Sequence, residues 1–453
     1  MREELNSKLG FYNSAFLKIH IHSTEDLQKL EAVSIQTEAT YLHEYIHFLQ
    51  DISSTYGLMN ICSIVDYIKL TNNNTISKKL NEVKVPFVPE AIGENDVKAN
   101  WQLKRIYLGG GNGLNDVNVV NSICKCIESV SSNKGQINVE KVVIDFSDSQ
   151  GNIYKYSIGA YCVSESMAYE IEKILYPDVL PKPAKMPYES VRIMCDYLLP
   201  GFSENPQNVI ALCDSCMMLF NPGVFVFDTL CAMSKVGFIP QSPESVYQFV
   251  YSNVSFSYHG HSTVQQLLIS TAAEGISQLN DYFTTPLFKD NRLWINYEIT
   301  SAIDLRIINP YFILDIVRGG SILKDGKVNN KYFVYLLHKL GSPIVVNDEG
   351  DMTFILPTAT SFETRSEYFW VFDQIYKMYQ KGITQDTYKC EMIDYCNLRA
   401  KLNGIEEYTD ENCRYSPWLR AKADDPNPCL FGQVWKTWGL EDVTVKSNQD
   451  NEA

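Results

Sequence analysis

The sequence is short of positive charge. It has 39 lysine and arginine residues against 54 aspartate and glutamate residues, a formal net charge of −15 at pH 7. No run of lysine and arginine stands out that would form a local basic patch. Because an acidic surface repels phosphate backbones, the sequence predicts that nucleic acid is not a partner.

Long apolar runs and a secretory signal are also missing. The most apolar stretch, Val209 to Met233, is interrupted by two aspartates, an asparagine and a proline. It therefore predicts buried helix rather than a membrane span. The first residues lack the basic-then-apolar pattern of a secretory signal. We therefore expect a cytoplasmic protein without a membrane partner, whose twelve cysteines are reduced thiols rather than a disulfide framework.

No internal repeat or low-complexity tract divides the 453 residues. Four prolines between Pro177 and Pro187 mark the best candidate linker. Strand and helix patterns are mixed before it, and helical periodicity dominates beyond it. We expect an α+β fold in which residues 1–180 form a core with a small sheet. Residues 181–445 would form a mainly helical lobe that completes a cleft, and residues 446–453 a frayed tail.

Two segments of the N-terminal part have clear local patterns. From about Ser34 to Asp66 the periodicity is helical, with Gly57 as the expected interruption. Residues 141–146 and 153–158 predict a β-hairpin around a polar turn. Directly after it, residues 159–175 turn helical, with small side chains that would allow close packing on another helix.

The most informative residues are 43 to 47, His-Glu-Tyr-Ile-His, an H-E-x-x-H match. The composition gives roughly 0.01 such matches by chance. On a helix, the i, i+4 spacing places both imidazoles one turn apart on one face, close enough for a single ion. Only three charged residues occur between residues 37 and 52, which favours a cavity over the alternative of a solvated helix face.

This segment resembles the active-site helix of the zincin metallopeptidases, and the resemblance covers only that helix. It implies that His43 and His47 ligate zinc and that Glu44 is the general base in peptide-bond hydrolysis. The metzincin branch has Gly and His at the third and sixth residues after the second histidine. Here Gln50 and Ser53 occupy those positions, so the likeness is to the gluzincin branch, which takes a glutamate from a downstream helix.

Glu165 is the expected third ligand, because it lies off the apolar stripe of its helix among small residues. Glu170 is the alternative. Glu170 and Glu172 adjoin Lys173 and are expected to be solvated. The gluzincin pattern has an aspartate four residues after the ligand glutamate to orient a histidine. Tyr169 occupies that position here, so either a different residue orients the histidine or the ligand lies elsewhere.

Two weaker signals concern tyrosine and histidine. Tyr258 and His259 lie in an expected loop, and the resemblance implies that such residues stabilise the oxyanion. A plain loop is the alternative. His20 and His22 share a face of a predicted strand, where they either line the cleft or form an ordinary polar pair on an edge strand.

The residues and the resemblance together predict an intracellular zinc metallopeptidase with Zn²⁺ as cofactor and a protein or peptide as substrate. A peptidase inside the cell has to be restrained, so a regulatory partner is expected, as in a narrow-target bacterial toxin or phage-defence effector. The alternative is a non-catalytic, zinc-stabilised interaction or scaffold protein, in which the metal has no open position.

Overall fold

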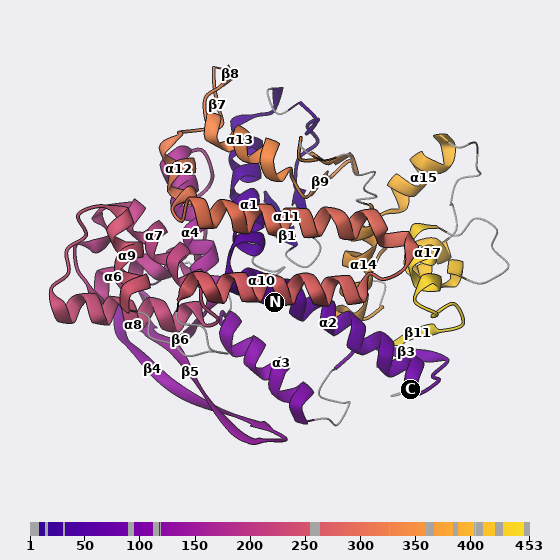
Figure 1. Ribbon diagram of the computed structural model, residues 1–453, viewed down its shortest axis with the longest axis horizontal. Helices are drawn as coiled ribbons and strands as arrows, with labels where there is room; N and C mark the ends of the chain where they lie inside the picture. The colour runs from indigo at the N-terminus through magenta and orange to yellow at the C-terminus, as the bar shows by residue number, and fades with distance from the viewer. Residues whose placement is uncertain are drawn as a thin grey trace.

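Helices predominate in the computed structural model, and the sheets are small, which gives a mixed α+β fold (Figure 1). The structure describes residues 9–13, 17–29, 32–88, 95–111, 117, 119–253, 263–325, 327–358, 360, 367–383, 388–402, 404, 411–421 and 429–447. The α+β class expected from the sequence is confirmed at this level.

The described strands are β1 (Gly10–Asn13), β2 (Lys18–Ile21), β3 (Glu82–Val85), β4 (Val119–Ser132), β5 (Gly135–Ser147), β6 (Ile153–Ile158), β7 (Leu323–Lys324), β8 (Lys327–Val328), β9 (Ile344–Asn347), β10 (Met352–Thr353) and β11 (Thr444–Ser447). The described α-helices are α1 (Ile35–Ser53), α2 (Thr55–Ser77), α3 (Asn95–Leu108), α4 (Ala160–Leu175), α5 (Lys185–Tyr188), α6 (Ser190–Leu198), α7 (Pro206–Met217), α8 (Pro222–Val236), α9 (Pro243–Asn253), α10 (Val264–Tyr282), α11 (Lys289–Ile308), α12 (Phe312–Arg318), α13 (Lys331–Leu340), α14 (Glu367–Lys381), α15 (Ile393–Leu402), α16 (Glu411–Tyr415) and α17 (Leu430–Thr437).

The four-stranded sheet has the order β1-β2-β9-β10, and it brings the N-terminal strands against strands from late in the chain. β2 pairs in parallel with β9, whereas β1 and β10 pair antiparallel with their neighbours. This pairing joins strands from either side of the boundary expected near residue 180. β11 pairs in parallel with β3. It includes residues 446 and 447 of the expected frayed tail, while residues 448–453 lie outside the described ones.

Helix α1 is buried from Thr37 to Ser53 apart from one intermediate position, and it packs against α2, α4, α11 and β1. The interruption expected at Gly57 lies three residues earlier, at Ser54, whose side chain accepts a hydrogen bond from the Gly57 amide. Gly57 is still required there, because a Cβ would lie 2.3 Å from the Cα of Asp51. α2 can therefore begin against the last turn of α1.

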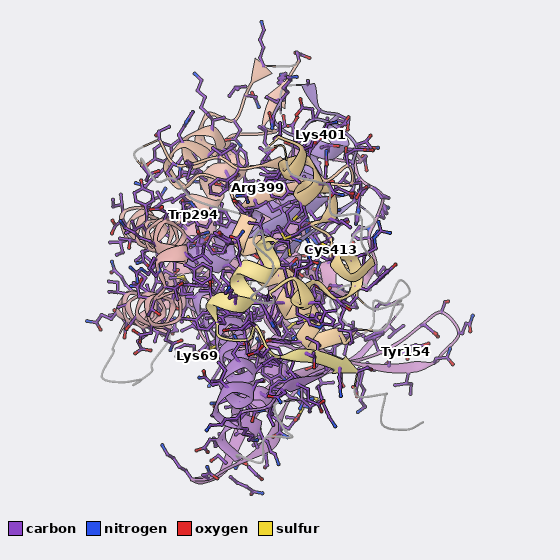
Figure 2. All side chains as sticks on the ribbon, turned by 90° about the vertical axis from the view of Figure 1, so that its right-hand side faces the viewer. Lys69, Tyr154, Trp294, Arg399, Lys401 and Cys413 are labelled. Atoms are coloured by element: carbon purple, nitrogen blue, oxygen red, sulfur yellow. The ribbon has the colours of Figure 1, made fainter. Side chains whose placement is uncertain are left out.

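The predicted hairpin of β5 and β6 is confirmed, with Phe146 opposite Tyr154. Figure 2 labels Tyr154 beside this hairpin, which stands out from the helical body. β4, which the sequence analysis did not predict, adds a third strand, and its long antiparallel pairing with β5 projects beyond α3 and α8 (Figure 1). β4 is buried at only two positions, Ile123 and Val130, so it lacks the apolar alternation that would predict a strand.

β6 leads through Gly159 directly into α4. A Cβ on Gly159 would lie 2.5 Å from the carbonyl carbon and oxygen of Leu108, at the end of α3. The missing side chain therefore lets α3 close on this junction and fix where α4 starts beside α1. The helix expected at residues 159–175 is confirmed as α4.

The core is one continuous apolar cluster with a small satellite beside the β4–β5 hairpin. None of the twelve cysteines forms a disulfide. Cys213 and Cys216 of α7 are fully buried in that core, where a thiol packs as a small apolar side chain. Among the described residues, none of the helices combines the length and the apolar character that a membrane span requires.

Candidate metal centre

Three side chains from two helices converge. α1 contributes His43 and His47, and α4 contributes Glu165, with ligand atoms that all lie within 4.8 Å of one another. The Oε2 atom of Glu165 is 3.5 Å from Nε2 of His43 and 3.4 Å from Nε2 of His47. In a tetrahedral zinc site, bonds of the usual length separate neighbouring ligand atoms by about 3.3–3.5 Å. The two separations to Glu165 therefore match the edges of a tetrahedral zinc site.

Hydrogen bonds behind the two imidazoles set their tautomers. His43 Nδ1 donates to Oε2 of Glu172 at 2.8 Å, and His47 Nδ1 donates to Oε1 of Gln50 at 2.8 Å. The orientation of the Gln50 amide is fixed in turn, because its nitrogen donates to the Ser164 carbonyl at 3.0 Å. With a proton held on each Nδ1, the nitrogen that faces Glu165 in both histidines is Nε2, which a metal ion would bind in exchange for its proton.

Electrostatic interactions in the cluster favour positively charged histidines facing a negatively charged Glu165. Burial alone would lower the pKa of His43 and of His47. The nearby carboxylates, Glu165 at both histidines and Glu172 also at His43, outweigh burial and raise the two pKa values. Burial would raise the pKa of Glu165, yet the two histidines hold it below its usual range. Burial raises the pKa of Glu44 to about 6, although the positive charges of His43 and His47 act to lower it.

The donor set fits a zinc ion. Two imidazole nitrogens and one carboxylate oxygen are ligands that zinc accepts, and three protein ligands leave a further position for a reactant. The side chains of His43, His47 and Glu165 are 8%, 12% and 16% exposed. The centre is thus nearly enclosed, with a small part of each ligand side chain in contact with solvent.

The structure corrects the expectations for the neighbours of Glu165. Glu170 is buried and makes a two-fold ion pair with Arg192 at 2.6 Å, so it is a structural residue rather than an alternative ligand. Glu172 is also buried, contrary to the solvated position expected beside Lys173. Glu172 orients His43 and lies seven residues after Glu165 in the sequence. The aspartate that orients a histidine in the gluzincin pattern lies only four residues after the ligand glutamate.

Two aromatic side chains at the centre were missed by sequence reasoning. The ring of Tyr12 in β1 stacks beside His47, with centroids 6.4 Å apart, and the ring of Tyr188 in α5 lies 6.3 Å from that of His43. Burial, followed by the charge of Glu165, raises the pKa of the Tyr188 phenol. No local pattern marks either tyrosine, since each is placed by tertiary contacts. The predicted oxyanion residues Tyr258 and His259 lie outside the described residues.

His20 and His22 do not line this centre. In β1, Tyr12 faces His47, and its neighbour Phe11 faces the other side of the sheet, where its ring stacks on His20. β2 is also an inner strand rather than an edge strand, since it pairs with both β1 and β9. The two histidines thus lie on the opposite face of the sheet from the α1–α4 cluster.

The arrangement can hold a divalent ion between two helices, with a carboxylate next to the ligands and an aromatic ring on either side. The whole chain finds no match among protein-family models, curated proteins or solved structures. The chemistry of the centre therefore has to follow from its own atoms.

Proposed function

We propose that the protein is a zinc-dependent metallopeptidase whose centre is formed by His43, His47 and Glu165. The observation that carries this proposal is the convergence of two Nε2 atoms on one carboxylate oxygen, at 3.5 and 3.4 Å, with all three ligand atoms within 4.8 Å of one another. A bound zinc ion supplies a Lewis acid that polarises a carbonyl and makes water nucleophilic near neutral pH.

The chain's own groups have separate tasks in this proposal. Glu44, on the same helix as both histidines, accepts a proton from the attacking water and delivers it to the leaving amine. Glu172 and Gln50 keep the imidazoles in the required tautomer and orientation. The buried Tyr188, next to His43, is the described residue best placed to donate a hydrogen bond to the developing oxyanion.

The enclosed geometry supports a restrained enzyme acting on a narrow set of peptides. A centre with 8–16% exposed ligands admits an extended segment far more readily than a folded surface. This is in keeping with a cytoplasmic effector, such as a bacterial toxin or defence protease, that a partner or trigger opens. The competing proposal is a scaffold stabilised by zinc. Structural sites normally have four protein ligands, and the cluster found among the described residues has three.

The test compares wild type with His47→Ala, Glu165→Ala and Glu44→Gln. Elemental analysis should show one equivalent of zinc less than wild type in His47→Ala, less zinc in Glu165→Ala, and full zinc in Glu44→Gln. Mass spectrometry of a proteome-derived peptide library should detect new termini with wild type and none with Glu44→Gln. Full zinc in His47→Ala would disprove the metal centre. Zinc-loaded wild type that cleaves nothing would support the scaffold.

A further inference from the structure

A second group of metal-binding side chains lies on the far face of the four-stranded sheet. Asp348 follows β9, and its Oδ1 atom is 2.9 Å from Nε2 of His20 and 3.0 Å from Nδ1 of His22. The three ligand atoms lie within 4.8 Å of one another, as in the α1–α4 cluster. Two imidazole nitrogens again converge on one carboxylate oxygen.

The backbone holds these side chains in place. His20 lies in β2, and His22 directly follows the strand, where its amide donates to the Leu9 carbonyl at 2.7 Å. The two imidazole rings lie side by side, with centroids 4.7 Å apart. β2 pairs with β9 in a register that puts His20 opposite Val346, two residues before Asp348. The turn is tied to the end of β2, because the Asp348 amide donates to the Ser23 carbonyl at 3.1 Å. The donors are thus preorganised, which lowers the entropic cost of binding.

The imidazoles have further features that suit ligation. Phe11 stacks on His20 with ring planes only 3° apart and centroids at 5.0 Å, which fixes the ring orientation. The side chains are 18%, 38% and 42% exposed, so an ion can enter from solvent without any movement of the core.

We propose that His20, His22 and Asp348 form a second divalent transition-metal site, suited to Zn²⁺ or Cu²⁺, which nitrogen-rich sites prefer. The present atom separations are a few tenths of an ångström below the tetrahedral edge of about 3.3–3.5 Å. A small outward shift of the exposed Asp348 turn would accommodate the ion. The remaining coordination positions face solvent.

This site is connected to the α1–α4 cluster through one strand. Phe11 pairs with His20 on the outer face of β1 and β2, and the next residue, Tyr12, packs beside His47 on the inner face. An ion on the outer face would order β1 and thereby the ring that borders the inner centre. This consequence rests on the proposed function, whereas the binding site itself does not.

The experiment uses full-length protein in which His47→Ala and Glu165→Ala disable the inner centre. After treatment with a chelator, calorimetry with Zn²⁺ alone and electron paramagnetic resonance with Cu²⁺ alone should show one bound ion. The Cu²⁺ spectrum should carry coupling to two imidazole nitrogens. Adding His22→Ala or Asp348→Ala should weaken binding at least about 10-fold, while His338→Ala, an exposed histidine on α13, should leave it unchanged.

Equal binding in the His22→Ala and His338→Ala proteins would overturn the proposal, as would the absence of a bound ion in the disabled background. Circular dichroism would verify that each variant is folded. Because the inner ligands are already removed, a negative result here would not bear on the peptidase proposal. A positive result would not support it either.

Discussion

At the scale of single residues, we expect the groups hydrogen-bonded to His43 and His47 to influence metal affinity in addition to the proposed ligands themselves. Glu172→Ala removes the acceptor for His43 Nδ1 and frees the imidazole to rotate or change tautomer. We expect zinc affinity to fall about 10- to 100-fold, measured by competition with a chromogenic chelator. Glu172→Gln keeps an acceptor oxygen and should lose much less. Equal losses in the two variants would show that charge, rather than orientation, is what Glu172 supplies.

Glu298 in α11 makes stability depend on pH. Burial raises its pKa well above the usual value, although a contact with Trp294 opposes this; Figure 2 labels Trp294 among the packed helices. The folded state therefore binds this proton more tightly than the unfolded chain does. Its contribution to stability is complete below the unfolded pKa of about 4.5 and is lost as the pH rises toward the folded pKa.

Glu298→Gln removes this dependence. The unfolding free energy of the variant, measured by denaturant titration, should rise relative to wild type as the pH increases from 5 to 8, by about 1.4 kcal/mol per pH unit until the folded pKa is reached. Glu349→Gln, in an exposed turn, is the control and should follow wild type. A constant difference across this range would mean that Glu298 is ionised in the folded protein.

At the scale of elements, the junction of β6 and α4 positions Glu165. Gly159→Ala would place a Cβ 2.5 Å from the Leu108 carbonyl, and the backbone there can only move away. We expect a loss of about 1–3 kcal/mol in unfolding free energy together with weaker zinc binding, since α4 has to shift. Gly275→Ala in α10 meets only the Cys62 sulfur, at 3.2 Å, and is the matched control. Denaturant titration of both variants would decide, and equal stability would disprove the constraint.

The elements that the sequence predicted are those with a strong local signal. The α1 helix, the β5–β6 hairpin and α4 each have periodicity or turn chemistry within a short window. The convergence of Glu165 on His43 and His47 followed from a motif and an apolar stripe. The partnership of Glu172 with His43 could not be foreseen, because the two residues are 129 positions apart and nothing local distinguishes a buried glutamate from a solvated one. For the same reason the parallel pairing of β2 with β9 was not predicted.

At the scale of the whole molecule, the pairing of β3 with β11 ties the last described segment to the N-terminal half. Truncation after residue 443 removes β11 and exposes the apolar surface that Val445 buries. We expect a loss of about 2 kcal/mol, detected as a lower melting temperature. Truncation after residue 447 leaves the strand intact and should match the full chain. No difference between the two truncations would show that β11 adds nothing to stability.

The α1–α4 cluster can also be considered as a crosslink in a polymer. An ion held by His47 and Glu165 joins positions 118 residues apart (165 − 47) and closes a loop that contains α2, α3 and the three-stranded sheet. Closing so long a loop restricts the unfolded chain far more than the folded one. Metal removal should therefore make this loop more susceptible to limited proteolysis than the rest of the chain. An ion bound at this cluster would then stabilise the segment between the two helices, whether or not it also takes part in catalysis.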